Sequence, residues 1–110
     1  MLIEDTRPDG MAERAEEAAA ALRLLAHPAR LLILCALVEG EASVSALQER
    51  LGLSQPEVSQ QLARLRKMNL VASVRDGRVV RYRLNDPRIR FVLSGLYAAY
   101  CNDDSPMPIA

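Results

Sequence analysis

The stretch that decides the fold is residues 53–84, which read LSQPEVSQQLARLRKMNLVASVRDGRVVRYRL. Ser54 is followed three residues later by Glu57, the pattern of a capping box at the start of a helix. We therefore expect a helix over 55–68. Its apolar residues recur at helical spacing on one face, namely Val58, Leu62 and Leu65. The sequence predicts that this face packs on a core and that the opposite, polar face is exposed.

After Asn69 the pattern changes to one rich in β-branched residues. Two strands, 70–75 and 78–84, are expected on either side of Asp76-Gly77, which is a strong signal for a β-hairpin. If the turn has two residues, Arg75 and Arg78 lie directly opposite each other across the strands. A capped helix followed by a basic hairpin is typical of the second half of a winged helix–turn–helix.

Outside this stretch, helix signals predict four more helices, over 11–25, 29–39, 43–51 and 88–100. Pro28 suits the first position of the second helix, with His27 as its cap, and this helix is apolar nearly all round, so we expect it at the centre of the core. Ser43 caps the third helix, Gly52 closes it, and Asp86-Pro87 begins the last. The predicted fold is mainly α with a small β-hairpin, a winged helix–turn–helix in the order α-α-α-α-β-β-α.

The length of 110 residues is that of one domain. We expect this domain over 11–101, between a flexible acidic segment, 1–10, and a flexible tail, 102–110. The longest apolar run, Leu31 to Val38, is too short to span a bilayer, and the acidic first ten residues do not resemble a signal peptide. A cytoplasmic location with reduced cysteines is therefore the expectation.

The formal net charge of zero conceals a separation of charges along the chain. Residues 1–20 carry six acidic and two basic side chains, whereas residues 61–90 carry nine basic and two acidic ones. Such a separation favours a polyanion-binding surface in the second half of the chain. The alternative is a solvated surface of helix and hairpin with no ligand.

The polar face of the helix at 55–68 has side chains suited to the major groove of DNA. Ser59 and Gln60 can hydrogen-bond base edges, and Arg64 and Lys67 are better placed for phosphates. The alternative is that these residues form only the wet side of an amphipathic helix. The candidate DNA-binding residues are Ser54, Gln55, Ser59, Gln60, Arg64, Lys67, Arg75, Arg78 and Arg81.

Enzymatic chemistry finds little support in this sequence. It contains one histidine, no glycine-rich phosphate loop and no set of nucleophile and base that the predicted fold would bring together. We expect a protein that is not an enzyme and that needs no cofactor.

Three segments resemble the ArsR/SmtB family of bacterial repressors: LAHPARLLIL at 25–34, LSQPEVSQQLARL at 53–65 and GRVVRYRL at 77–84. The resemblance extends over roughly 14–101. It implies a homodimeric winged helix–turn–helix repressor that binds an inverted repeat in double-stranded DNA. It also implies that the first and last helices, 11–25 and 88–100, form the dimer interface.

The metal sites of the family do not carry over to this sequence. Where many members have Cys-x-Cys at the start of the third helix, this chain has Ser43-Val44-Ser45. Asp86 stands where other members have a zinc ligand, but no histidine follows it. A zinc site needs about four nitrogen, sulfur or oxygen ligands, so we do not expect metal sensing.

Cys35 in the second helix and Cys101 at the end of the last are the two cysteines. This pair resembles the dithiol of the sulfide- and persulfide-responsive branch of the family. The resemblance implies that the two thiols lie close within one subunit and are joined by a disulfide or polysulfide bridge when reactive sulfur rises, which weakens operator binding. Three alternatives stay open: a sensor of general thiol oxidation such as peroxide or disulfide stress, a constitutive DNA-binding protein with inert cysteines, and a winged helix that binds another protein.

Overall fold

The computed structural model describes residues 8–101 of the chain. The expected tail at 102–110 and the first seven residues lie outside this range. Helical backbone begins at Pro8, inside the segment that we expected to precede the domain. A short π-helix, η2 (Pro8–Ala12), runs directly into the first α-helix.

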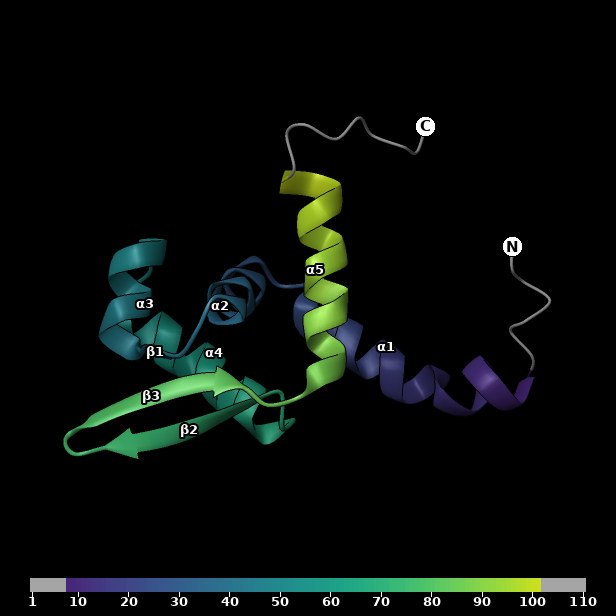
Figure 1. The fold of residues 1–110 in the computed structure, drawn as a ribbon, viewed down its shortest axis with the longest axis horizontal. Coiled ribbons are helices and arrows are strands. Elements are labelled where there is room, and N and C mark those ends of the chain that lie inside the picture. Colours follow the sequence, from purple (N-terminus) through teal and green to yellow (C-terminus); the bar gives the residue numbers. More distant parts are fainter. Residues whose placement is uncertain (1–7, 102–110) are drawn as a thin grey trace.

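The described residues form five α-helices and three strands, as expected for a mainly α winged helix–turn–helix (Figure 1). The helices are α1 (Glu13–Leu25), α2 (Pro28–Val38), α3 (Val44–Leu51), α4 (Gln55–Lys67) and α5 (Pro87–Cys101). The strands are β1 (Ala42–Ser43), β2 (Val71–Asp76) and β3 (Val79–Leu84). In Figure 1, α1 and the β2–β3 hairpin extend to opposite sides of the molecule, and α5 lies between them.

The helix ends follow from local signals in the sequence. His27 caps α2 by accepting a hydrogen bond at Nδ1 from the Ala29 amide over 3.2 Å, and Pro28 occupies the first turn. The Ser43 hydroxyl caps α3 by accepting from the Ala46 amide at 3.1 Å. Gly52 ends α3 with a φ of 71°, a left-handed conformation that favours glycine. The predicted caps of α2 and α3 are confirmed.

The sheet has three strands in the order β1-β3-β2, one more than the hairpin that we expected. Ala42 pairs with Tyr82 and Ser43 pairs with Arg81, so β1 covers the outer edge of β3. A strand of two residues is too short to show the alternation of apolar and polar side chains that identifies a strand in a sequence. It forms because the tertiary fold brings Ala42 and Ser43 against β3.

The hairpin register differs from the prediction by one residue. Asp76 pairs with Val79 and Arg75 pairs with Val80, so the loop is Gly77-Arg78 rather than Asp76-Gly77. Gly77 has a φ of 68°. A positive φ is typical of a glycine at the first position of a two-residue hairpin loop. The prediction that Arg75 and Arg78 face each other is therefore wrong.

The core forms around α2, as its apolar sequence predicted. Ile33, Leu34 and Leu37 are almost completely buried there. The predicted inner face of α4 packs against α2, and Val58, Leu62 and Leu65 are equally buried. Leu47 of α3 and Leu93 of α5 complete this core, which holds α3, α4 and the hairpin in one body.

The helix α1 contributes little to the core, since Leu25 is its one buried residue. Large apolar side chains stay exposed on η2, α1 and α5, namely Met11, Leu22, Phe91, Val92, Tyr97 and Tyr100. No single helix among the described residues is long and apolar enough to cross a membrane; α1 with its preceding turns and α2 reach that length only as a pair, bent by 98°.

Candidate nucleic-acid interface and thiol pair

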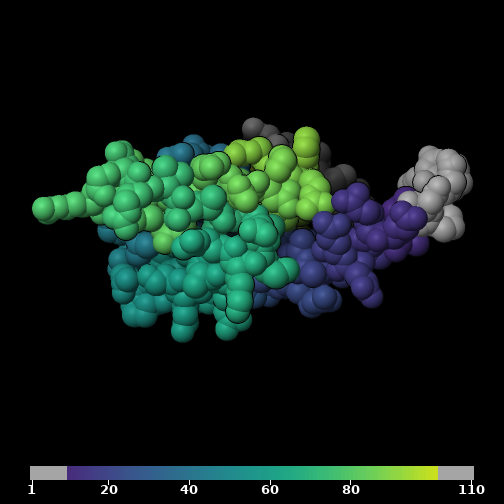
Figure 2. All heavy atoms as spheres, turned by 90° about the horizontal axis from the view of Figure 1, so that it is seen from below, coloured from purple at the N-terminus to yellow at the C-terminus, as the bar shows by residue number. Residues whose placement is uncertain are grey.

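The helix α4 and the hairpin lie side by side on one face of the molecule, and the end of the hairpin projects beyond it (Figure 2). On the outer side of α4, Gln60, Arg64 and Lys67 are exposed and Ser59 is half-buried. The structure therefore brings the predicted base-reading and phosphate-binding side chains of α4 onto one surface. Arg66 and Arg83 are also exposed, and the sequence analysis did not single them out.

The first turn of α4 is held by its own side chains. The Ser54 hydroxyl accepts a hydrogen bond from the Glu57 amide at 3.2 Å, and the Gln55 amide donates to the Ser59 hydroxyl at 3.0 Å. Both hydroxyls accept in these bonds, so Ser54 and Ser59 each keep a hydroxyl proton for donation to a ligand. The Glu57 carboxylate accepts from Gln61 at 3.1 Å. Among the described residues, no hydrogen bond runs from the Ser54 amide to this carboxylate, so only the Ser54 half of the capping box forms.

The arginines of the hairpin differ in whether they form an ion pair. Arg81 forms an ion pair with Asp76 at 3.0 Å, which offsets part of its charge. Arg75 reaches the Gly77 carbonyl only at 3.5 Å. Arg78 is exposed in the two-residue loop at the end of the hairpin. Among the described residues, the hairpin therefore presents Arg75, Arg78 and Arg83 as exposed cations outside any ion pair, and Arg75 and Arg78 do not face each other.

A buried polar chain behind α4 was missed by the sequence analysis. Gln61 is only 6% exposed and lies among the core residues of α4. Its carbonyl oxygen accepts from Arg30 Nη1 at 2.9 Å, and Arg30 Nε donates to the Leu24 carbonyl at 2.8 Å. The signal was present, because position 61 is three residues after Val58 and four before Leu65 and so falls on the apolar face.

The two thiols line the same cleft, which has a volume of about 650 Å³ and lies between α2, the end of α3 and α5. Cys35 is half-buried and Cys101 is exposed. The lining residues are Leu32, Cys35, Ala36, Val38, Glu39, Arg50, Leu51, Leu93, Ser94, Tyr97, Ala98 and Cys101. An ion pair between Arg50 and Glu39 lies at this cleft.

Burial raises the pKa of the Cys35 thiol, and the negative charge of the Cys101 thiolate raises it further. Cys35 is therefore protonated at neutral pH. Because the thiolate is the nucleophile, the exposed Cys101 is the thiol that an incoming electrophile meets first.

Among residues 8–101, no group of three or more potential metal-ligating side chains comes together. Asp86, which the family resemblance made a possible zinc-ligand position, is held by Arg88 at 2.9 Å. Hydrogen bonds from Arg88 lower the pKa of this carboxyl. Arg88 also pairs with Glu17 at 3.0 Å and so joins the start of α5 to α1.

Comparison with known proteins places this geometry in a family. Residues 27–73 match the model of the bacterial regulatory proteins of the arsR family. The biofilm growth-associated repressor of Xylella fastidiosa (strain 9a5c) is 40% identical over 102 residues, which cover 89% of this chain and 90% of the relative.

Solved structures are similar over most of the chain. The crystal structure of the transcriptional repressor BigR from Xylella fastidiosa has a TM-score of 0.80 at 40% identity, covering 92% of this chain and 98% of that one. The homodimeric winged helix–turn–helix DNA-binding domain of Mb0332 from Mycobacterium bovis has a TM-score of 0.69 at 26% identity, covering 79% and 81%. BigR is described as a transcriptional repressor and Mb0332 as a possible ArsR-family transcriptional regulator. This chain belongs to the ArsR family of bacterial transcriptional regulators.

Proposed function

We propose that the protein is a homodimeric repressor of the cytoplasm whose affinity for an inverted-repeat operator is lowered when reactive sulfur joins Cys35 to Cys101. The observation that carries the proposal is the common cleft of the two thiols between α2 and α5. One wall of this cleft is the central core helix, and the other belongs to a helix with exposed apolar side chains.

Operator binding is supported by the surface of α4 and the hairpin. Gln60 is exposed on α4 and can pair with adenine, while Arg64 and Lys67 can contact phosphates. In a winged helix–turn–helix, the second helix of the motif enters the major groove, and here that helix is α4. The hairpin extends this surface along the DNA backbone.

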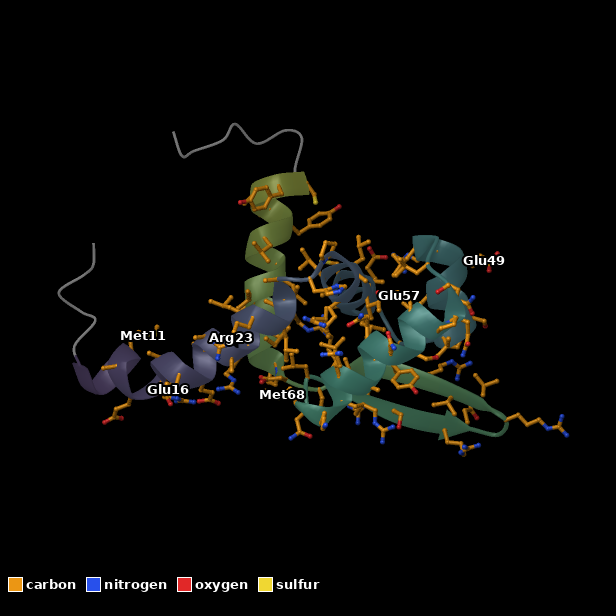
Figure 3. All side chains as sticks on the ribbon, turned by 180° about the vertical axis from the view of Figure 1, so that it is seen from behind. Met11, Glu16, Arg23, Glu49, Glu57 and Met68 are labelled. Atoms are coloured by element: carbon orange, nitrogen blue, oxygen red, sulfur yellow. The ribbon has the colours of Figure 1, made fainter. Side chains whose placement is uncertain are left out.

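Dimer formation is supported by the poor burial of α1 and α5 within one protomer. A groove of about 500 Å³ runs between them and is lined mainly by apolar side chains of α1, α5 and the end of α4. Met11 and Met68, both labelled in Figure 3, belong to this groove. A second copy would bury these surfaces and place two copies of α4 against two half-sites.

The sulfur chemistry needs no external oxidant. The Cys101 thiolate attacks the outer sulfur of an organic persulfide, becomes a cysteine persulfide and releases the organic thiol. Cys35 then attacks the Sγ atom of the Cys101 persulfide, and a disulfide forms between the two cysteines. The outer sulfur leaves, takes up the proton of the Cys35 thiol and departs as hydrogen sulfide. A second organic persulfide can first transfer another sulfur to the Cys101 persulfide and release its thiol. Cys35 then attacks the middle sulfur, hydrogen sulfide leaves, and a trisulfide forms.

The bridge acts on DNA binding through the spacing of the two reading helices. Because half-sites are separated by about one turn of DNA, a small change in that spacing lowers affinity. A coupling of about 1–3 kcal/mol between bridge and operator is typical of such switches.

The test treats the reduced protein with an organic persulfide and measures peptide masses and operator affinity together. We expect a Cys35–Cys101 crosslinked peptide, carrying extra sulfur where the bridge is longer than a disulfide, and a fall in affinity that reductant reverses. Cys35→Ser and Cys101→Ser should each bind operator when reduced and lose the response, because a bridge needs both partners.

Hydrogen peroxide and diamide separate the proposal from general redox sensing. A direct disulfide needs Cα atoms within about 7 Å, whereas inserted sulfur spans a wider gap. We expect persulfide to release DNA at doses at which the two oxidants do not. Persulfide-induced release of DNA by a single-cysteine variant would contradict the two-thiol mechanism. If the native protein does not release DNA under any of these treatments, it is a constitutive DNA-binding protein.

A further inference from the structure

A continuous chain of side-chain hydrogen bonds links three helices behind the surface of α4. Arg30 of α2 donates from Nε to the Leu24 carbonyl at 2.8 Å and from Nη1 to the Gln61 side-chain carbonyl at 2.9 Å. The Gln61 amide then donates to the Glu57 carboxylate at 3.1 Å. Figure 3 labels Glu57 on α4, beside α2.

The direction of these bonds is set by charge. A guanidinium only donates and a carboxylate only accepts, so the amide between them has one orientation that satisfies both. Its carbonyl faces the cation and its amino group faces the anion, and such aligned bonds strengthen one another in a low-dielectric interior. No buried side-chain nitrogen or oxygen in the described part of the chain lacks a partner.

The far end of the chain is the last turn of α1. The Ala26 amide satisfies the Leu22 and Arg23 carbonyls at the end of α1. The Leu24 carbonyl lies beyond them, where the helix offers no further amide, and accepts from Arg30 instead. A cation is favourable there because the carbonyl end of a helix carries partial negative charge. Arg30 therefore joins the end of α1, a helix of the proposed dimer interface, to the first turns of α4.

We propose that Arg30 and Gln61 are positioning residues for operator recognition, which set the orientation of α4 relative to α1. An apolar side chain at position 61 would satisfy packing, since Val58, Leu62 and Leu65 already form the inner face of α4. The amide adds direction, because the Arg30–Gln61 bond of 2.9 Å joins α4 to α2 and the Arg30–Leu24 bond of 2.8 Å joins α2 to α1. These two bonds restrict rotation and sliding of α4 as apolar contacts do not. The Gln61–Glu57 bond lies within α4 and fixes which end of the amide faces Arg30. Gln61 itself is buried away from the DNA-facing surface.

The inference rests on the proposed function, because orientation matters only if α4 reads DNA. A tilt of α4 moves its base-contacting side chains out of hydrogen-bond reach, whereas contacts to phosphates are less sensitive to direction. Loss of the chain should therefore lower affinity for a specific site and leave affinity for random DNA nearly unchanged.

The experiment compares two duplexes: one selected by the native reduced protein from a random pool, and one of the same composition in shuffled order. Gln61→Leu removes both bonds of the amide and should weaken binding to the selected duplex at least tenfold, with less than a twofold change on the shuffled one. Arg30→Met keeps the aliphatic stem and should do the same. Thermal unfolding of each variant reports whether the protein is folded.

A swap of two side chains tests direction without loss of polarity or net charge. Gln61→Glu alone sets two carboxylates against each other and should reduce the preference for the selected duplex. Adding Glu57→Gln should restore it to within about threefold, because the amide then donates to the new carboxylate, which still accepts from Arg30. The control adds Glu41→Gln, at an exposed position before β1, to Gln61→Glu in place of Glu57→Gln. This pair has the same net charge as the swap but keeps the two carboxylates opposed, so it should not restore the preference.

Folded Gln61→Leu protein with the native preference, or a swap that fails to restore the preference lost in Gln61→Glu, would overturn the inference. A native protein that shows no preference for any duplex after selection would instead overturn the proposed function, and the inference with it.

Discussion

Cys35 and Cys101 occupy the same cleft, but their surroundings suit different steps. Cys101 ends α5 and is exposed, so it can meet a persulfide from solvent. Cys35 is half-buried in the central helix, where burial raises the pKa of its thiol. A protonated Cys35 is a poor nucleophile toward a dissolved electrophile, but it can act once a sulfur adduct is held beside it, because proximity replaces a second encounter.

The raised pKa of Cys35 gives a prediction for pH dependence. Below that pKa the thiolate fraction rises about tenfold per pH unit. The alkylation rate of Cys35 should therefore rise about tenfold per pH unit, from neutral pH to beyond the pKa range of an ordinary thiol. The measurement is the rate of iodoacetamide modification in Cys101→Ser, in which burial alone acts on Cys35. A rate that levels off near neutral pH would show that the Cys35 thiol is activated rather than suppressed.

At the scale of elements, α4 and the hairpin present different chemistry on one surface. Gln60 on α4 carries an amide that can both donate and accept, as a base edge requires. The hairpin ends in Arg78, and its neighbour Arg81 is already paired with Asp76. The proposed function therefore predicts base reading by α4 and phosphate contact by the loop of the hairpin.

Substitutions on these two elements should separate the roles. Gln60→Ala should lose about 1–3 kcal/mol on the selected operator and change binding to random DNA little. Arg78→Ala should weaken binding to both duplexes. It should also reduce the slope of log affinity against log salt by about one unit, because binding with one phosphate contact fewer releases fewer counterions. Fluorescence anisotropy across a salt series measures both. Equal losses for Gln60→Ala on the two duplexes would exclude base reading by that residue.

At the scale of the whole molecule, the protomer has one well-packed body and one poorly buried helix. The body forms around α2, whereas α1 extends from it and buries only Leu25 (Figure 1). Arg88 joins the start of α5 to α1 through its ion pair with Glu17, and a second ion pair joins it to Asp86, directly before α5. These side chains do not cover the apolar residues exposed on both helices. This arrangement is what a two-fold dimer through α1 and α5 would complete.

Phe91 tests the dimer directly because it is 80% exposed on α5. Phe91→Glu should leave the protomer folded and produce monomers by analytical ultracentrifugation, since an unpaired charge cannot be buried at an apolar interface without a large cost. Tight operator binding should be lost with the dimer. Ala46→Glu, which adds the same charge to exposed α3, should remain dimeric. A native protein that sediments as a monomer would refute the dimer.

Much of the fold could be predicted because its signals act over three or four residues. His27, Ser43 and Ser54 cap the helices that follow them, as expected, and the apolar spacing of α4 identified its buried face. The same local reasoning identified the exposed candidates Gln60, Arg64 and Lys67. These predictions succeed because caps and helix faces depend on neighbours in the chain.

Only the tertiary structure decided features that join distant residues. The strand β1 needs β3, some forty residues later; the Gly77-Arg78 loop depends on the register of both strands; and Arg30 meets Gln61 across 31 positions. Sequence resemblance implied that Cys35 and Cys101 lie close, and their common cleft depends on how α5 packs on α2. The sequence by itself determined helices, caps and faces, because short-range hydrogen bonds and side-chain spacing govern them. Register, the third strand and the buried polar chain were decided by packing, because their partners meet only when the core has formed.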